Sequence, residues 1–323
     1  MTDATVVRRQ VIRLYFGSVR FFKNLILLAV CVLIAVPTIF AVKYRREAAA
    51  FAALPPPIEE ALPLQNEAEM FEPELPHDSS SVVSDAAEFS ADPPAYQALY
   101  DDFYAPQPYG ATERIENTIY LTFDDGPSDR TDEVLDILAE KNVKATFFVV
   151  GQSDEEDLAR MRRIVEEGHT IGMHSYSHNY SLVYSSVESF LDEFYRNFKQ
   201  IQEATETTPT VFRFPGGSIN GYDGGFYQEI ISEMIRRGFV PFDWNISSED
   251  AATGHIVPTQ ALVDNVVRSA SGKIRGFVLF HDSEMKVTTP EALGPAIDQL
   301  RGMGFEFAAI TPSTLPVLYS YTQ

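Results

Sequence analysis

The chain has 323 residues, 45% of them hydrophobic and 12% aromatic, which is enough to bury a substantial core. Its formal net charge is −21, and Cys31 is its single cysteine. The acidic balance excludes a nucleic-acid partner, because binding to a phosphate backbone needs clustered Lys and Arg. A single cysteine excludes an intrachain disulfide.

The N-terminal part is basic and contains one long apolar run. Residues 25–42 carry no charge, and a helix of this length spans about 27 Å, close to the hydrocarbon core of a bilayer. A cleaved signal peptide is the alternative, but Lys43, Arg45 and Arg46 follow the run in place of a small-residue cleavage site. More basic residues precede the run than follow it. We therefore expect a cytoplasmic segment over residues 1–24, a single-pass helix in the lipid bilayer, and an extracytoplasmic remainder.

Composition changes abruptly after the apolar run. Residues 43–115 are rich in proline and acidic residues and show no apolar period, so they cannot bury enough surface to offset the entropy lost on ordering. We expect a disordered stalk that joins the membrane anchor to a catalytic domain, residues 116–323. Four aromatic residues near the end of the stalk are candidates for packing on that domain: Tyr96, Tyr100, Phe103 and Tyr104.

From residue 117 onward, short apolar runs alternate with amphipathic stretches. The predicted strands are Thr118–Phe123, Ala145–Val149, Thr170–Met173, Val211–Phe214, Phe239–Asp243, Phe277–Phe280 and Phe305–Ala309. The predicted helices are Thr131–Lys141, Glu155–Glu167, Val187–Ala204, Gly225–Arg237, Thr259–Ser271 and Glu291–Gly302. The helix-to-strand turns are expected at Gly168, Gly238, Gly276 and Gly304. This alternation predicts an α/β fold with a parallel sheet, either doubly wound or closed into a barrel.

Unusual polar residues occur at the carboxyl ends of five of the predicted strands. In chain order they are Asp124 and Asp125, His174 and His178, Arg213, the stretch Asp243–Asp250, and His281 with Asp282. Catalytic residues of parallel α/β folds gather at the carboxyl ends of the strands. The sequence therefore predicts that these side chains form one site.

The residue types in this set indicate a metal. His174 and His178 have the spacing that puts two imidazoles on one face of a helix. Two adjacent carboxylates in one cleft repel each other unless a cation is shared, so the Asp124–Asp125 pair strengthens the hypothesis. One carboxylate and two imidazoles leave open coordination positions, the pattern of catalytic zinc sites.

These motifs resemble those of the polysaccharide deacetylases with a NodB homology domain, including membrane-anchored peptidoglycan N-acetylglucosamine deacetylases. The motifs occur in the order of that family between residues 117 and 310, as Thr122-Phe123-Asp124-Asp125-Gly126-Pro127, His174-Ser175-Tyr176-Ser177-His178, Arg213-Phe214-Pro215-Gly216-Gly217, Asp243–Asp250 and Leu279-Phe280-His281-Asp282. The resemblance implies a distorted (β/α) barrel of about seven parallel strands and a divalent-metal hydrolase that acts on N-acetylated sugars.

The resemblance also implies a role for each matched residue. Asp125, His174 and His178 match the metal ligands, with Zn²⁺ as the first choice and Co²⁺, Fe²⁺ or Ni²⁺ as alternatives. Asp124 matches the general base, which takes a proton during attack on the acetyl carbonyl. Arg213 matches the residue that orients this base.

His281 matches the general acid, and Asp250 matches the carboxylate that holds its ring and raises its pKa. The candidates for contact with the substrate or its oxyanion are Pro215, Gly216, Trp244 and Leu279. The family often has an aromatic residue where this chain has Gly216 and a tryptophan where it has Ala251, so the expected substrate groove differs in shape.

We expect a hydrolase that removes N-acetyl groups from N-acetylglucosamine-type residues of a cell-wall glycan such as peptidoglycan. The alternatives are an O-acetyl esterase on xylan or another acetylated polysaccharide, and an inactive glycan-binding protein. A nucleotide partner is not expected, because Gly216-Gly217 lacks a phosphate-loop pattern. We interpret Asp282 as a structural hydrogen-bond acceptor, and Glu249, His169 and His255 as surface residues.

Overall fold

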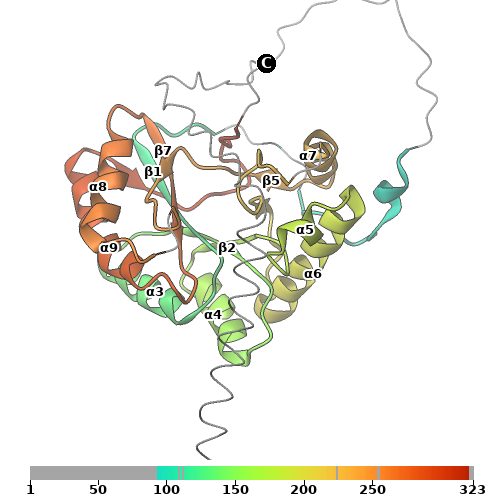
Figure 1. The fold of residues 1–323 in the computed structure, drawn as a ribbon, viewed down its shortest axis with the longest axis horizontal. Coiled ribbons are helices and arrows are strands. Elements are labelled where there is room, and N and C mark those ends of the chain that lie inside the picture. Colours follow the sequence, from blue (N-terminus) through green and yellow to red (C-terminus); the bar gives the residue numbers. More distant parts are fainter. Residues whose placement is uncertain (1–92, 108–109, 111–112, 223–224, 253–254, 320–323) are drawn as a thin grey trace, which may run out of the picture. The chain divides into compact units, whose positions relative to one another are not determined.

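The structure is a computed structural model that describes residues 93–107, 110, 113–222, 225–252 and 255–319 (Figure 1). The predicted cytoplasmic segment and transmembrane run, residues 1–42, lie outside these ranges, as does most of the predicted stalk. No helix within the described residues is long and apolar enough to cross a bilayer.

In the described part of the chain, eight strands form one parallel sheet. They are β1 (Thr118–Asp124), β2 (Thr146–Val149), β3 (Thr170–Met173), β4 (Val211–Phe212), β5 (Val240–Pro241), β6 (Ile246–Ser247), β7 (Arg275–His281) and β8 (Glu306–Phe307). Their order is β5-β4-β3-β2-β1-β7-β6. Strand β7 pairs with β1 along its whole length, so β8 and β2 share the other edge of β1.

The two ends of the sheet are close in sequence. The path begins at β5 and finishes at β6, and only residues 242–245 separate these strands. The seven strands of this path form a half-barrel with helices around it, as the sequence predicts for a (β/α) barrel (Figure 1). Strand β6 was not predicted, because two residues in a polar stretch give no apolar run.

Helices surround the strands on the outside (Figure 1). They are the 3-10 helix η1 (Ala95–Ala98) and the α-helices α3 (Asp129–Lys141), α4 (Glu155–Glu166), α5 (Tyr180–Val183), α6 (Val187–Thr205), α7 (Tyr227–Arg236), α8 (Thr259–Ala270) and α9 (Thr288–Gly302). Ser128, Asp154 and Ser186 cap α3, α4 and α6 by accepting backbone N–H groups. Six of these helices were predicted with ends within a few residues, whereas η1 and the one-turn α5 were not.

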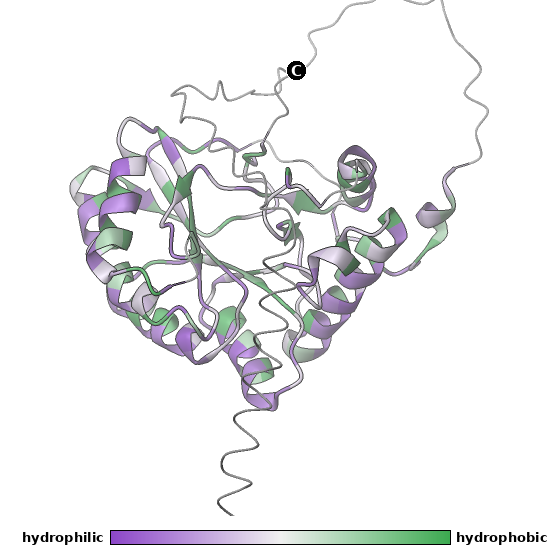
Figure 2. Ribbon diagram, viewed as in Figure 1, coloured by the Kyte–Doolittle hydropathy of each residue, from purple (hydrophilic) through white to green (hydrophobic). Residues whose placement is uncertain are grey.

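The core lies where the strands meet these helices. Every residue of β1 is buried, as expected for a parallel strand covered on both faces. Five phenylalanines interpreted as core residues have no exposed surface: Phe147, Phe148, Phe239, Phe277 and Phe280. The helices show hydrophilic and hydrophobic colours side by side along their length, because only one face of each is apolar (Figure 2).

One of the four expected turn glycines was assigned wrongly. Gly168, Gly238 and Gly304 have positive φ angles after helices α4, α7 and α9. Gly276 instead lies inside β7, where a Cβ atom would be 2.5 Å from Ile246 Cδ1. After α8 the positive φ falls on Gly272. Gly276 therefore permits close packing within the sheet rather than a turn.

The aromatic residues before position 116 pack on the domain, as expected. Phe103 is fully buried in the core, and the Tyr100 ring stacks on Tyr195 of α6 at 4.2 Å. Arg237, at the end of α7, is also buried, and its guanidinium donates to the backbone carbonyls of Tyr96, Leu99, Tyr100 and Phe103. The folded domain therefore begins before residue 116.

Candidate active site

The predicted site residues leave neighbouring strands at one edge of the sheet. Asp124 of β1 is in register with His281 of β7, and Met173 of β3 is in register with Phe212 of β4. Asp125, His174 and Arg213 each follow one of these strand ends directly. The parallel sheet thus brings together residues up to 157 positions apart, as in Asp124 and His281.

Asp125, His174 and His178 form a compact cluster of three candidate metal ligands. Asp125 Oδ1 lies 3.1 Å from His178 Nε2 and 3.4 Å from His174 Nε2. One donor atom from each residue lies within 4.8 Å of the others. The His174 side chain is 3% exposed, whereas those of Asp125 and His178 are 25% and 30% exposed, so the cluster opens on their side.

The two histidines reach this cluster from a loop and not from one helical face, which corrects the prediction from their spacing. Residues 174–179 lie between β3 and α5, and both Ser175 and His178 have positive φ angles, 69° and 51°. Asp125 does too, at 70°. Such backbone is unfavourable for residues with a Cβ atom and concentrates at functional sites.

Helix α6 supports this loop through two buried polar residues that the sequence analysis missed. Glu193 accepts hydrogen bonds from the backbone N–H and the hydroxyl of Ser177, both at 2.7 Å. Asn197 accepts one from the His174 N–H at 3.3 Å. Glu193 and Asn197 are four residues apart on the apolar stripe of α6, and this break in the stripe is the signal that could have revealed them.

The tautomer of His174 is set by its surroundings. Its Nδ1 lies 2.9 Å from the backbone carbonyl of Arg213, which can only accept a hydrogen bond. Nδ1 therefore carries a proton that it donates to this carbonyl, and Nε2 faces Asp125. Burial lowers the pKa of His178, which favours a neutral ring there.

Asp124 is held by a buried arginine. Arg213 has no exposed surface, and its Nη1 donates to Asp124 Oδ1 at 2.8 Å and to Thr122 Oγ1 at 2.7 Å. The remaining guanidinium donors bind the carbonyls of Phe242 and Asp243. These bonds fix the guanidinium in place, so Asp124 keeps one orientation, with Oδ2 3.8 Å from His174 Nε2.

His281 is held by Asp250 and lies beside Asp125 of the cluster. Its Nδ1 lies 2.7 Å from Asp250 Oδ1, and its Nε2 lies 4.0 Å from Asp125 Oδ2. Asp250 Oδ2 also accepts from the His281 N–H and from Thr289 Oγ1. Burial alone would lower the pKa of His281, but the hydrogen bond and charge of Asp250 outweigh it and raise the pKa to about 9.

Of the four candidate substrate residues, Gly216 is exposed, Trp244 is partly buried, and Pro215 and Leu279 are buried. The Pro215 carbonyl accepts a hydrogen bond from the Tyr184 hydroxyl at 2.7 Å. Leu279 lies inside β7, two residues before His281. Among the described residues, none accepts a hydrogen bond from the Gly216 N–H.

Three further interpretations can be checked. Asp282 is a structural acceptor as predicted: its buried carboxylate accepts from Thr131 at 2.6 Å, and burial raises its pKa to about 7. Glu249 and His255 are exposed, as predicted. The surface assignment of His169 is wrong, since its ring is buried against Phe147 and its Nδ1 accepts from the Ala145 N–H. Burial lowers its pKa to about 4.

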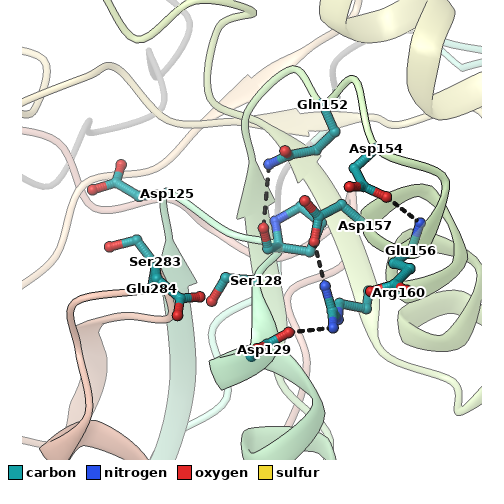
Figure 3. Close-up of a pocket in the computed structure, with 11 residues that line it drawn as sticks. Asp125, Ser128, Asp129, Gln152, Asp154, Glu156, Asp157, Arg160, Ser283 and Glu284 are labelled. Carbon is teal, nitrogen blue, oxygen red and sulfur yellow. Dashed lines mark hydrogen bonds and ion pairs between the residues drawn. The ribbon is translucent and has the colours of Figure 1, made fainter. Parts of the chain in front are cut away.

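A pocket of about 390 Å³ lies beside Asp125 (Figure 3). The loops after β1, β2 and β7 and the N-terminal parts of α3 and α4 line it with Asp125, Pro127, Ser128, Asp129, Gln152, Asp154, Glu156, Asp157, Arg160, Ser283 and Glu284. Its one cationic lining residue, Arg160, is paired with Asp129 and Asp157. The pocket therefore carries a negative potential that disfavours anionic groups beside the cluster.

The cluster fits a divalent metal. Two ligands about 2.0–2.1 Å from Zn²⁺ at a tetrahedral angle are about 3.3 Å apart, close to the separations of Asp125 from the two imidazoles. Asp125 Oδ1 is buried and has no hydrogen-bond partner in the described part of the chain, although two imidazole nitrogens lie nearby. Burial would raise the pKa of Asp125, yet His174, His178 and His281 hold it well below its usual range.

Comparison with known proteins places this geometry in a family. The family model described as polysaccharide deacetylase matches residues 111–223. The peptidoglycan-N-acetylglucosamine deacetylase of Bacillus cereus is 31% identical over 218 residues, which cover 64% of this chain and 72% of that protein. The chain belongs to the polysaccharide deacetylase family. It is therefore an enzyme of the deacetylase class, as the motifs predicted.

Other relatives match a similar share of the chain. The peptidoglycan-N-acetylglucosamine deacetylase PgdA of Listeria monocytogenes is 33% identical over 200 residues, which cover 61% of this chain and 39% of that protein. The crystal structure of the catalytic domain of peptidoglycan N-acetylglucosamine deacetylase from Eubacterium rectale superposes with a TM-score of 0.62 and 31% identity, covering 66% of this chain and 97% of that one. The structural similarity thus spans almost the whole of a solved catalytic domain.

Proposed function

We propose that this polysaccharide deacetylase is a metal-dependent hydrolase that removes N-acetyl groups from N-acetylglucosamine-type residues of a cell-wall glycan such as peptidoglycan. The observation that carries the proposal is the Asp125–His174–His178 cluster, with Asp124 on one side and His281 on the other. The similarity to peptidoglycan N-acetylglucosamine deacetylases supports the choice of substrate.

Asp125, His174 and His178 would hold a divalent cation, with Zn²⁺ as the first choice. When bound, such a cation lowers the pKa of water and polarises the acetyl carbonyl. The chain itself prepares the two imidazoles, because the Arg213 carbonyl binds Nδ1 of His174 and turns its Nε2 towards Asp125, and burial lowers the pKa of His178.

Asp124 is the side chain positioned to act as general base. Its Oδ2 faces the cluster while Oδ1 is bound to Arg213, so one oxygen remains free to accept a proton from the attacking water. Gly216 is exposed and, among the described residues, none accepts a hydrogen bond from its N–H, which supports a role for this N–H in binding the acyl oxygen as negative charge develops on it.

His281 is the side chain positioned to act as general acid. With a pKa of about 9 it is protonated at neutral pH, and Asp250 leaves its Nε2 as the free donor. A protonated Nε2 facing the cluster can give its proton to the leaving amine. Protonation of the amine is what distinguishes amide cleavage from ester cleavage, because an unprotonated amine is a poor leaving group.

We also propose that Trp244 and Leu279 contact the glycan and that residues 25–42 anchor the enzyme in the cell membrane. The anchor would place the catalytic domain outside the cytoplasm, within reach of a wall polymer. Because Tyr96, Tyr100 and Phe103 belong to the folded domain, the stalk predicted for residues 43–115 would end before Tyr96. Membrane fractionation of the full chain tests this part, and recovery of the enzyme in the fraction that alkaline carbonate releases would contradict it.

Acetate release by the full-length enzyme in detergent tests the reaction. We expect release from N-acetylglucosamine oligomers or peptidoglycan with Zn²⁺ or Co²⁺, loss of release after chelation, and recovery when the metal is restored. Release from acetylated xylan alone would make the protein an O-acetyl esterase. Glycan binding without release under any metal would make it an inactive binding protein.

A further inference from the structure

Gly216 leaves a space beside the candidate metal cluster, and Tyr180 fills it. Gly216 has a φ of 78°, and a Cβ atom there would lie 2.8 Å from Tyr180 Cε1 and 3.0 Å from the Tyr180 hydroxyl oxygen. A side chain at position 216 and the ring of Tyr180 therefore compete for the same volume. The glycine is what allows the tyrosine to approach the loop that carries the exposed N–H.

Tyr180 is the middle member of a row of rings that leads from the cluster to the surface. Its ring meets the His178 imidazole edge-on, with centroids 5.3 Å apart and planes at 86°. On its other side the Tyr222 ring lies 5.1 Å away. Tyr180 is half-buried, whereas Tyr222 is 58% exposed. The row thus begins at a candidate ligand and ends in solvent.

The two segments that carry these rings, helix α5 with Tyr180 and the loop after β4 with Tyr222, are held by hydrogen bonds. Tyr184, which neighbours Tyr180 at 6.1 Å, donates its hydroxyl to the Pro215 carbonyl. Asn220 donates to the Gly217 carbonyl and accepts from the Tyr222 N–H. The positions of Tyr180 and Tyr222 are therefore fixed relative to Gly216, as a binding surface requires.

The chemistry of this surface fits a pyranose ring. A pyranose presents C–H groups on its faces and polar groups around its rim, so it packs against an aromatic ring while its rim makes hydrogen bonds. Tyrosine offers an apolar ring and a polar handle together. Within the described residues, the Tyr180 hydroxyl has no hydrogen-bond partner, although the ring that carries it is half-buried.

We propose that Tyr180 and Tyr222 form the wall against which the acetylated sugar packs, and that the Tyr180 hydroxyl donates a hydrogen bond to that sugar. This inference rests on the proposed function, because it places a glycan at the cluster. Both tyrosines then determine binding of the sugar ring, while proton transfer stays with the carboxylate and histidine side chains described above.

Steady-state kinetics on two substrates test the wall. One is an N-acetylglucosamine tetramer, and the other is a small aryl acetate that lacks a sugar ring. For Tyr222→Ala we expect KM for the tetramer to rise about tenfold, which corresponds to about 1.4 kcal/mol. We expect kcat and the hydrolysis of the aryl acetate to stay within about twofold, because a binding group acts on the substrate that touches it.

Tyr180→Ala should raise KM for the tetramer at least as much, and Tyr180→Phe should show the part due to the hydroxyl alone. The bound metal is measured in each variant, because Tyr180 packs against His178. Tyr104→Ala is the matched control: this tyrosine is 37% exposed but lies on Arg236 of α7, in the segment before residue 116. Its kinetics should equal those of the wild type.

Two results would overturn the wall. One is an unchanged KM for the tetramer in both alanine variants with metal intact, and the other is an equal loss on both substrates. If the wild-type enzyme releases no acetate from any glycan, the proposed reaction fails instead. Calorimetric titration with the tetramer then still tests whether the two tyrosines bind the sugar, because Tyr222→Ala must weaken binding of the tetramer about tenfold.

Discussion

Asp250→Asn removes the negative charge beside His281 while keeping nearly the same shape. In the wild-type enzyme Asp250 accepts three hydrogen bonds, from His281 Nδ1, from the His281 N–H and from Thr289 Oγ1. The charge and hydrogen bond of this carboxylate outweigh the effect of burial and raise the pKa of His281 to about 9. Without that charge, only the carboxylates of Asp125 and Asp124 still raise the pKa of His281 against the effect of burial, so we expect it to fall towards the ordinary histidine value of about 6.5.

The pH dependence of the loss follows from these values. At pH 8 a group with a pKa of about 9 is about 90% protonated, whereas one with a pKa of about 6.5 is about 3% protonated. If protonated His281 is the general acid, Asp250→Asn should lower kcat about 30-fold at pH 8. At pH 6 the two enzymes should differ by less than about twofold from this cause. The alkaline limb of the profile should therefore move to lower pH.

The assay is acetate release from an N-acetylglucosamine oligomer by the metal-loaded enzyme between pH 5 and about 10. Asp282→Asn is the matched control, because it converts a buried carboxylate that contacts Thr131 and should leave the alkaline limb in place. A cation in the cluster would shift the alkaline limbs of the wild type and of Asp250→Asn alike. The difference in pH between these two limbs is therefore the quantity that tests the reasoning. A loss for Asp250→Asn that is equal at every pH would refute the assignment.

Three other predictions concern the ligands, their support and stability. Asp124→Asn should keep the metal and lower kcat at least about 100-fold. His174→Ala should lose metal and activity together. Measuring the bound metal and the release of acetate for each variant distinguishes the two outcomes. Glu193→Gln weakens the two bonds that hold Ser177 and should lower metal affinity about tenfold in a Zn²⁺ titration; unchanged affinity would remove Glu193 from the site. His169 has a folded pKa of about 4, below its unfolded value of about 6.5, so the unfolded state takes up the proton first. As the pH is lowered from about 6.5 to about 4, the free energy of unfolding should therefore fall by up to about 1.4 kcal/mol per pH unit. Denaturant titrations of His169→Gln should show a shallower fall over the same pH range.

Most of the strands and the edge that carries the site could be predicted because both follow from local signals. The apolar runs of β1, β2, β3 and β7 are long enough to stand out from their surroundings, and parallel strands place their carboxyl ends together. The Asp124–Asp125 pair and the two histidines could be assigned to one site for the same reason. The helix that supports them could not be assigned to the site. Glu193 and Asn197 act from α6, which carries none of the predicted motifs.

The errors occur where tertiary packing decides. A histidine between a helix and a strand gives no sign of burial, and only the packing of Phe147 against His169 shows it. The segment before residue 116 has the composition of a linker, yet the buried Arg237 binds four of its carbonyls and Phe103 enters the core. Strand β6 has two residues and is defined by its pairing with β7. Each of these features depends on a contact between distant parts of the chain.

The backbone of the histidine loop could not be predicted for a different reason. The spacing of His174 and His178 is compatible with a helix, but the structure reaches the same convergence through positive φ angles at Ser175 and His178. None of these residues is a glycine, so the sequence gives no warning of left-handed backbone. Such conformations persist only when the surroundings hold them, and here Glu193, Asn197 and the Arg213 carbonyl do so. Three of the eight described non-glycine residues with positive φ angles, Asp125, Ser175 and His178, belong to the cluster or its loop, which is consistent with selection for ligand geometry over local stability.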